Sequence, residues 1–244
     1  MKEYLLPHFE ERSSQIKMIV FHCSALKIEE CIKVWNEYGV APHYVIDETG
    51  EIFKVVEETK KAFHAGAGYW AGMDDGLNDI SIGIELINPT MGQENYSELQ
   101  IKSLISLCKK LMKQYNIDKT NIVGHSDIAP MRKSDPGVAF PWKKMALEGI
   151  GCWYGDKDSI YDEDNRDVKA LLAKIGYDVR NDEAVIASAY AFRRHYLPEE
   201  VSIVADIQEL LENPYPKGDI SLLKGQKFIN TLMKVVKSKQ KGGL

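Results

Sequence analysis

The stretch "ISIGIELIN" (residues 80–88) decides the fold, because its apolar side chains fall on both faces of a strand. Apolar residues at both odd and even positions are typical of a strand that is buried on both faces of a sheet covered by helices. Gly83 interrupts this run, and Glu85 places a carboxylate in its middle. Charged groups are rarely buried without a partner. Glu85 therefore either faces a cation or a cavity, or lies on the solvent side of an edge strand.

Strand and helix patterns alternate around this stretch. The segments "MIVFHCS" (18–24) and "NIVGHS" (121–126) predict further buried strands, and "HYVIDETGEIFKVV" (43–56) predicts a hairpin. The segment "SELQIKSLISLCKKLMKQY" (97–115) predicts an amphipathic helix with a capping box that starts at Ser97. This alternation indicates an α/β domain, built on a mixed β-sheet flanked by helices.

The pattern changes after residue 153. The segment "YGDKDSIYDEDN" (154–165) is polar and acidic, as linkers are. Beyond it the strand patterns stop, and amphipathic helices are predicted in four segments: 165–177, 181–198, 202–214 and 219–237. In the second of these we expect His195 to be solvated. We therefore predict an α/β domain at 1–153, a linker at 154–164 and a small all-α domain at 165–244.

Composition excludes several classes of protein. The 244 residues carry a net charge of −5, which gives no indication of a nucleic-acid partner. No apolar run approaches the roughly 18 to 20 residues of a membrane span, and residues 1–14 lack the apolar core of a signal peptide. The four cysteines show no Cys-x-x-Cys spacing. We therefore expect ordinary thiols rather than a metal or redox motif.

Three residues are candidate metal ligands. His22 and His125 each stand at the end of a predicted buried strand, and Asp135 follows ten residues later in a loop stiffened by prolines. Histidine and carboxylate side chains are common zinc ligands, and a catalytic site uses three of them. Each histidine taken alone fits a buried structural role better than a metal-binding one. The residues alone therefore indicate a metal site without establishing it.

Five ordered motifs resemble those of the zinc-dependent N-acetylmuramoyl-L-alanine amidases of the type-2 family, which includes phage amidase lysozymes and peptidoglycan-recognition proteins. The motifs are "IVFHCSA" (19–25), "PHYVIDETGEI" (42–52), "FHAG" (63–66), "NDISIGIELIN" (78–88) and "GHSDIAPMRKSDPG" (124–137). The resemblance covers residues 16 to about 150 and implies a mixed sheet flanked by helices. Two later segments, "VKALLAKIGY" and "AYAFRRHY", resemble the small C-terminal peptidoglycan-binding domain of two-domain members.

The resemblance implies roles for five residues. His22, His125 and Asp135 match the ligands of one zinc ion per chain. Lys133 matches the lysine that stabilises the reacting carbonyl group, and Glu85 matches the general base. These roles fit hydrolysis at neutral pH, because zinc lowers the pKa of bound water to about 7.

One position departs from the phage members, which have a catalytic tyrosine where this chain has Pro42. The glutamate form of the mechanism therefore fits better, and His43 is expected to line the substrate pocket rather than to bind metal. Trp70 and Asn78 are further candidates for contact with glycan or peptide, and structural roles in loops fit them as well.

The resemblance implies hydrolysis of the amide bond between L-alanine and the lactyl group of N-acetylmuramic acid, or of its 1,6-anhydro form. The substrate would be peptidoglycan or muropeptide fragments. The alternatives are a non-catalytic peptidoglycan-recognition module and a zinc peptidase on the same scaffold. We expect a monomer without a transmembrane segment. The substrate favours the periplasm or cell envelope, while the missing signal peptide and unpaired cysteines leave the cytoplasm open.

Overall fold

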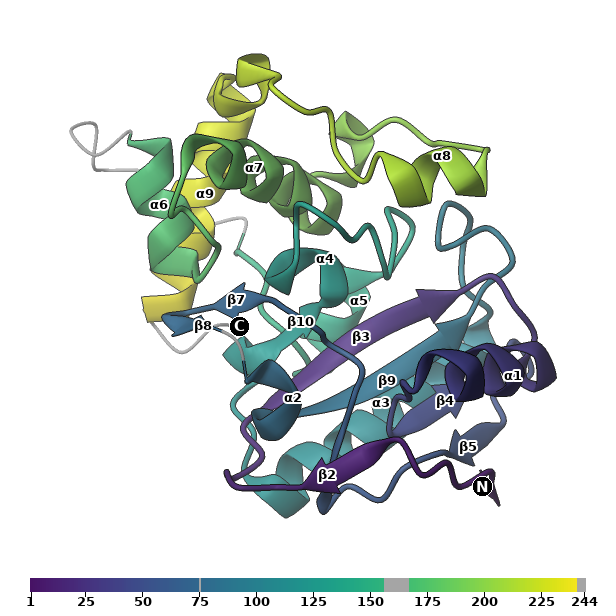
Figure 1. The fold of residues 1–244 in the computed structure, drawn as a ribbon. Helices are drawn as coiled ribbons and strands as arrows, with labels where there is room; N and C mark the ends of the chain where they lie inside the picture. The colour runs from purple at the N-terminus through teal and green to yellow at the C-terminus, as the bar shows by residue number, and fades with distance from the viewer. Residues whose placement is uncertain (75, 156–166, 241–244) are drawn as a thin grey trace.

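A six-stranded sheet forms the centre of the protein (Figure 1). The computed structural model describes residues 1–74, 76–155 and 167–240. The strands of the sheet are β1 (Lys2–Glu3), β3 (Met18–Ser24), β4 (Tyr44–Ile46), β5 (Ile52–Lys54), β9 (Ser81–Ile87) and β10 (Ile122–Gly124). Their order is β1-β5-β4-β9-β3-β10. β4 and β5 pair antiparallel and the other neighbours pair parallel, so the predicted mixed sheet is confirmed.

Helices cover both faces of this sheet. α1 (Ile28–Tyr38) packs on one face and α3 (Glu98–Tyr115) on the other (Figure 1). Alternate residues of β4 point into the two cores: Val45 packs with the cluster of α1, whereas Tyr44 and Ile46 pack with that of α3. Burial on both faces is the arrangement that the apolar pattern of the central strand predicts.

Shorter elements lie around the sheet. β2 (Phe9–Glu11) pairs with β6 (Lys60–Ala62), and β7 (Tyr69–Trp70) pairs with β8 (Met73–Asp74). The remaining short helices of this region are α2 (Leu77–Ile80), η1 (Lys119–Asn121), α4 (His125–Ile128) and α5 (Trp142–Leu147). The predicted strand at 121–126 therefore ends early, and its last two residues begin α4.

The predicted capping box of α3 is only half present. The Ser97 hydroxyl oxygen accepts a hydrogen bond from the backbone N–H of Gln100 at 3.1 Å, which caps the helix. The Gln100 side chain does not return to Ser97, because its amide donates to the carbonyls of Ile46 and Ile87 at 2.9 Å each. Gln100 therefore ties α3 to the ends of β4 and β9.

The last part of the described chain is helical, as predicted. Its elements are α6 (Val168–Ile175), α7 (Asp182–Tyr196), η2 (Pro198–Glu200), α8 (Ile207–Glu212), η3 (Ile220–Leu223) and α9 (Gln226–Gln240). The Asn181 side chain caps α7 by accepting the Ala184 N–H at 2.9 Å. The last predicted helix is interrupted, because Gly225, with φ of 108°, separates η3 from α9.

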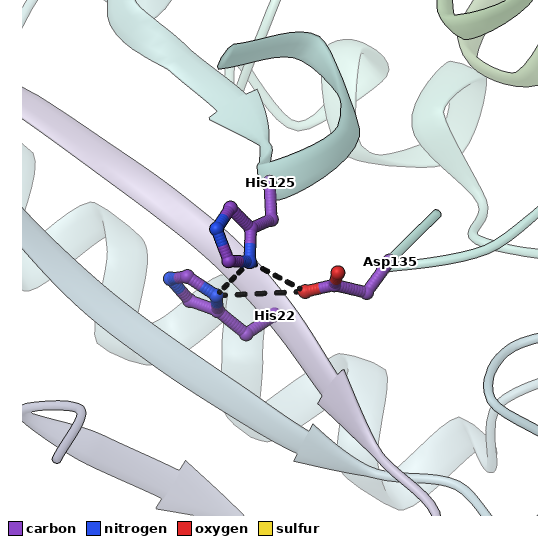
Figure 2. Close-up of side chains that lie close together, drawn as sticks. All are labelled: His22, His125 and Asp135. Carbon is purple, nitrogen blue, oxygen red and sulfur yellow. Dashed lines mark hydrogen bonds and ion pairs between the residues drawn. The ribbon is translucent and has the colours of Figure 1, made fainter. Parts of the chain in front are cut away.

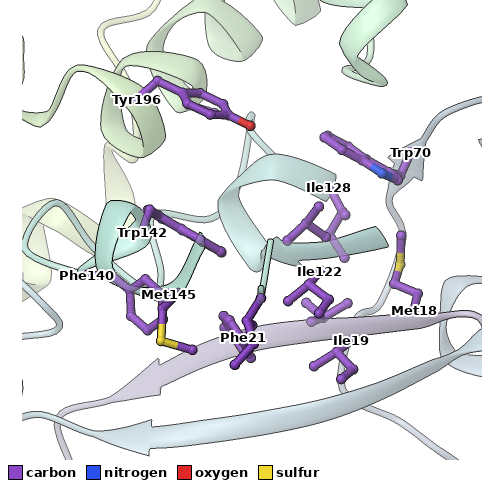
Figure 3. Packing of buried hydrophobic residues seen from close by; sticks show 14 of the residues in the cluster. Met18, Ile19, Phe21, Trp70, Ile122, Ile128, Phe140, Trp142, Met145 and Tyr196 are labelled. Carbon is purple, nitrogen blue, oxygen red and sulfur yellow. The ribbon is translucent and has the colours of Figure 1, made fainter. Parts of the chain in front are cut away.

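These helices share one buried core with the sheet. Figure 3 shows Tyr196 of α7 and Trp142 of α5 above the strand that carries Phe21. The expectation that His195 is solvated is wrong: its ring stacks on Trp142 with centroids 3.8 Å apart and is 5% exposed. The division into two domains stays a prediction, and most of its linker, residues 156–166, lies outside the described residues. Within the described ranges, no helix combines the length and the apolar character needed to cross a membrane.

Candidate active site and metal centre

Three neighbouring parallel strands bring the candidate residues to one edge of the sheet. The register of β3 and β9 places His22 opposite Glu85. β10 pairs with the other side of β3 and is followed at once by His125, the first residue of α4. Ligands of open α/β sheets bind at the carboxyl ends of such strands. The fold itself therefore assembles residues that are far apart in the sequence.

Two histidines and an aspartate form a buried cluster at this edge. Figure 2 shows the side chains of His22, His125 and Asp135 pointing toward one another. The two Nδ1 atoms lie 2.9 Å apart, and Asp135 Oδ2 lies 3.5 Å from His22 Nδ1 and 3.1 Å from His125 Nδ1. All three residues are at most 6% exposed. The ligand atoms lie within 4.8 Å of one another, close enough to hold one metal ion.

The donor set fits zinc. Two imidazole nitrogens and one carboxylate oxygen are a set that catalytic zinc sites use, with a position left for water. His125 Nε2 donates a hydrogen bond to the Ala65 carbonyl at 3.0 Å, so in a neutral ring Nδ1 is left unprotonated. The lone pair of His125 Nδ1 therefore points toward His22 Nδ1 and Asp135 Oδ2. The three atoms together attract only a cation or a proton.

The electrostatics of the cluster keep its members in their ligand forms. Burial lowers the pKa of His22 to about 4, and the neighbouring His125 adds to that effect. Burial alone would raise the pKa of Asp135, but the charge and hydrogen bonds of His125 and His22 hold it well below its usual range. At neutral pH His22 is therefore neutral and Asp135 is ionised, as metal binding requires.

Glu85 and Lys133 border the same space, and both are half-buried. Burial and, to a smaller extent, the Asp135 charge together raise the pKa of Glu85 to about 8, against the opposing charge of Lys133. Lys133 precedes Asp135 in a loop held by backbone hydrogen bonds from Lys133 N–H to the Ala129 carbonyl at 3.0 Å and from Ser126 N–H to the Asp135 carbonyl at 2.8 Å. The bond between Asp135 and Pro136 is cis. A carboxyl group and a lysine side chain thus lie beside the cluster of His22, His125 and Asp135.

His43 and Trp70 are both enclosed by the fold. His43 is 0% exposed, and its Nδ1 accepts the Gly83 N–H at 3.0 Å. Trp70 is 3% exposed and packs edge-on against Tyr177, with Gly176 against its ring. Both have a structural role, and their contact with substrate stays a prediction.

Asn78 holds a loop. Its Oδ1 accepts hydrogen bonds from the backbone N–H groups of His64 and Ala65, at 3.0 and 2.8 Å. Its contact with substrate stays a prediction, since the side chain is only partly buried.

Two buried polar residues next to the site were missed by reasoning from the sequence. His64 lies 2.9 Å from His22 through its Nδ1, and Asp127, 1% exposed, lies two residues after His125. His64 stood in a quoted motif, and Asp127 stood in the ligand loop. The sequence around His64 and Asp127 does not show which residues they contact, because their partners lie on other strands and helices.

Comparison with known proteins finds relatives of this chain. The model of the N-acetylmuramoyl-L-alanine amidase family matches residues 12–138. Over 220 residues the chain is 33% identical to N-acetylmuramoyl-L-alanine amidase AmiD of Escherichia coli K12, covering 80% of this chain and 79% of that protein.

Two solved structures resemble the whole chain. One is the E. coli AmiD complex with the substrate anhydro-N-acetylmuramic acid-L-Ala-D-gamma-Glu-L-Lys, with a TM-score of 0.72, 26% identity and coverage of 94% and 92% of the two chains. The other is AmpDh3 of Pseudomonas aeruginosa in complex with anhydromuramic pentapeptide, with a TM-score of 0.72, 27% identity and coverage of 93% of each chain. The chain belongs to the N-acetylmuramoyl-L-alanine amidase family.

Proposed function

We propose that the protein is a zinc hydrolase that cleaves the amide bond between the lactyl group of N-acetylmuramic acid, or its 1,6-anhydro form, and L-alanine. The observation that carries this proposal is the buried cluster of His22, His125 and Asp135, with Glu85 and Lys133 beside it. Family membership supplies the substrate class.

The cluster would hold one zinc ion through His22 Nδ1, His125 Nδ1 and an Asp135 oxygen. A zinc ion held there would supply Lewis acidity and lower the pKa of a coordinated water to about 7. Glu85 would take the proton of the attacking water and return it to the leaving amine of L-alanine. A raised pKa suits this task, because a base works best when its pKa lies near the working pH.

Lys133 would balance the negative charge that develops on the carbonyl oxygen. Its charge already acts on this space, since it lowers the pKa of both Glu85 and His22. The backbone hydrogen bonds of the ligand loop fix its position relative to Asp135. Positioning before the reaction is what makes such a charge effective.

A groove lined in part by Val138, three residues after Asp135, is large enough for part of a muropeptide. It has a volume of about 730 Å³ and is lined by residues 93–95 after β9, residues 138–139 after the ligand loop, and residues 198, 199, 201 and 203 of the helical part. Both solved relatives named above contain anhydromuramyl peptides. We infer that the helical part helps to bind the peptidoglycan strand or the stem peptide by forming one wall of this groove.

The assembled site comes from one chain, which supports action as a monomer. The substrate supports a place in the cell envelope, where peptidoglycan lies. The four cysteines are buried and unpaired, so they require no oxidising compartment.

Mass spectrometry of the products tests the proposal. Soluble anhydro-muropeptides and intact sacculi should both release peptides that begin with L-alanine, and Glu85→Gln is the matched control with an intact ligand set. Cleavage inside the stem peptide would make the protein a zinc peptidase. Binding to sacculi without any product would make it a recognition module.

A further inference from the structure

His64 of the "FHAG" segment (63–66) has no role in the mechanism described above. Its ring lies against the backbone of Gly83 in the middle of β9. A Cβ atom at residue 83 would lie 2.5 Å from His64 Cγ and 2.6 Å from His64 Nδ1. Side chains do not approach so closely, and glycine inside a strand often marks a close approach of this kind. The glycine that interrupts the central strand therefore leaves the space that the His64 ring fills.

A chain of hydrogen bonds starts at a backbone carbonyl and ends at a metal ligand. The Ser81 hydroxyl donates to the Leu77 carbonyl, which can only accept, and Ser81 Oγ lies 3.2 Å from His64 Nε2. Because the hydroxyl has only one proton, Ser81 Oγ accepts from His64 Nε2–H. His64 Nδ1 lies 2.9 Å from His22 Nε2.

The direction of this chain fixes the proton of His22. A neutral imidazole carries one N–H, so His64 Nδ1 is an acceptor when its Nε2 is protonated. His22 Nε2–H therefore donates to His64, and the lone pair of His22 Nδ1 points toward His125 and Asp135.

One short segment orients both histidine ligands. The His64 side chain contacts His22, while the carbonyl of the next residue, Ala65, accepts from His125 Nε2 at 3.0 Å. Asn78 Oδ1 holds the backbone N–H groups of both residues. The two imidazoles are thus set by adjacent residues on a single anchored loop.

We propose that His64 is a positioning residue that fixes the tautomer and ring orientation of His22 for metal binding through Nδ1. The inference rests on the proposed metal site, and His64 acts through His22 without touching the substrate. Outer partners of metal-binding histidines are worth about 10- to 100-fold in metal affinity or activity. His64→Leu should therefore weaken zinc binding by about 10- to 100-fold.

Competition with a chelator measures zinc affinity in the full chain. His64→Asn keeps an acceptor near the Nδ1 position and should recover part of the affinity, and Ser81→Ala should weaken it less than His64→Leu does. His8→Leu is the matched control, because it makes the same substitution at a histidine whose hydrogen-bond partner is the exposed Asn36 side chain. It should leave zinc affinity within about twofold of the wild type, since it deletes no outer partner of a ligand.

Two-bond nitrogen–proton NMR spectra of labelled histidines report the tautomer directly, without any variant. His22 of the wild type should be protonated at Nε2 both with and without zinc. Protonation at Nδ1 in the zinc-free chain, or unchanged zinc affinity in His64→Leu, would overturn the role of His64. Failure of the wild type to bind zinc would instead overturn the metal site, and the His22 tautomer would still be readable.

Discussion

Asp127 joins the ligand loop to the helical part of the chain. It follows His125 by two residues, and its carboxylate accepts hydrogen bonds from the Tyr177 hydroxyl at 2.6 Å, His195 Nδ1–H at 2.9 Å and the Gly124 N–H at 2.8 Å. The first two donors lie beyond residue 167. A buried acceptor that loses a donor costs free energy, because no water replaces the lost bond. Tyr177→Phe, which removes only the hydroxyl, should therefore destabilise the whole protein.

The size of the effect follows from the kind of bond removed. A hydrogen bond to a carboxylate contributes about 1.5–3 kcal/mol. For a chain of this length, each kcal/mol shifts the melting temperature by about 2–4 °C, so Tyr177→Phe should melt about 3–12 °C below the wild type. Differential scanning calorimetry of the zinc-loaded protein at pH 7 measures this difference. Tyr38→Phe is the matched control, because Tyr38 is 71% exposed and its loss should cost less than about 0.5 kcal/mol.

Equal melting temperatures for Tyr177→Phe and Tyr38→Phe would refute this reasoning. The bond to Asp127 would then contribute nothing, and the helical part would have to be held by apolar packing alone.

Three further predictions concern the metal, the reaction and pH. Wild-type protein should contain about one zinc per chain, and His125→Ala should lose it; full occupancy in the variant would remove His125 from the ligand set. Glu85→Gln should lower kcat by about 10² to 10⁴ and Lys133→Ala by about 10² to 10³, both with zinc retained, and near-normal turnover in either variant would dismiss its role. Burial lowers the pKa of His43 to about 3. The imidazole of His43 therefore binds a proton more readily in the unfolded chain, and the free energy of unfolding falls as pH drops below about 6.5. Urea unfolding at pH 7 and pH 5 should show a loss about 2 kcal/mol larger in the wild type than in His43→Gln, and equal losses would contradict the depressed pKa.

The central strands and main helices could be predicted because their patterns are local. The apolar residues of β3 and β9 form short continuous runs, and those of α3 recur with the period of a helix, so each element can be recognised from its own sequence. The ligand set could be predicted only through the family resemblance, since residue spacing alone left structural roles open for His22 and His125. Glu85 stood out because a carboxylate interrupts an apolar strand.

The burial of other polar residues could not be predicted, because their environment depends on segments that are distant in the sequence. The "RRHY" sequence looks solvated, yet Arg193 and Arg194 donate to the carbonyls of Leu222 and Pro214, and His195 is stacked on a tryptophan. A charged side chain can be predicted to be exposed to solvent only when the fold offers it no buried hydrogen-bond acceptor. The division into an α/β domain and an all-α domain stays a prediction, and the helices share a core with the sheet.

Gly83 has a consequence for attempts to stabilise this enzyme. Protein engineers commonly replace a glycine inside a strand, because β-branched residues favour extended backbone and reduce the freedom of the unfolded chain. Here the added atoms would displace the His64 ring, whose atoms lie within 2.9 Å of where a Cβ would stand. A design program that scores strand propensity would thus select a substitution that disorganises the proposed metal site through the His64 ring.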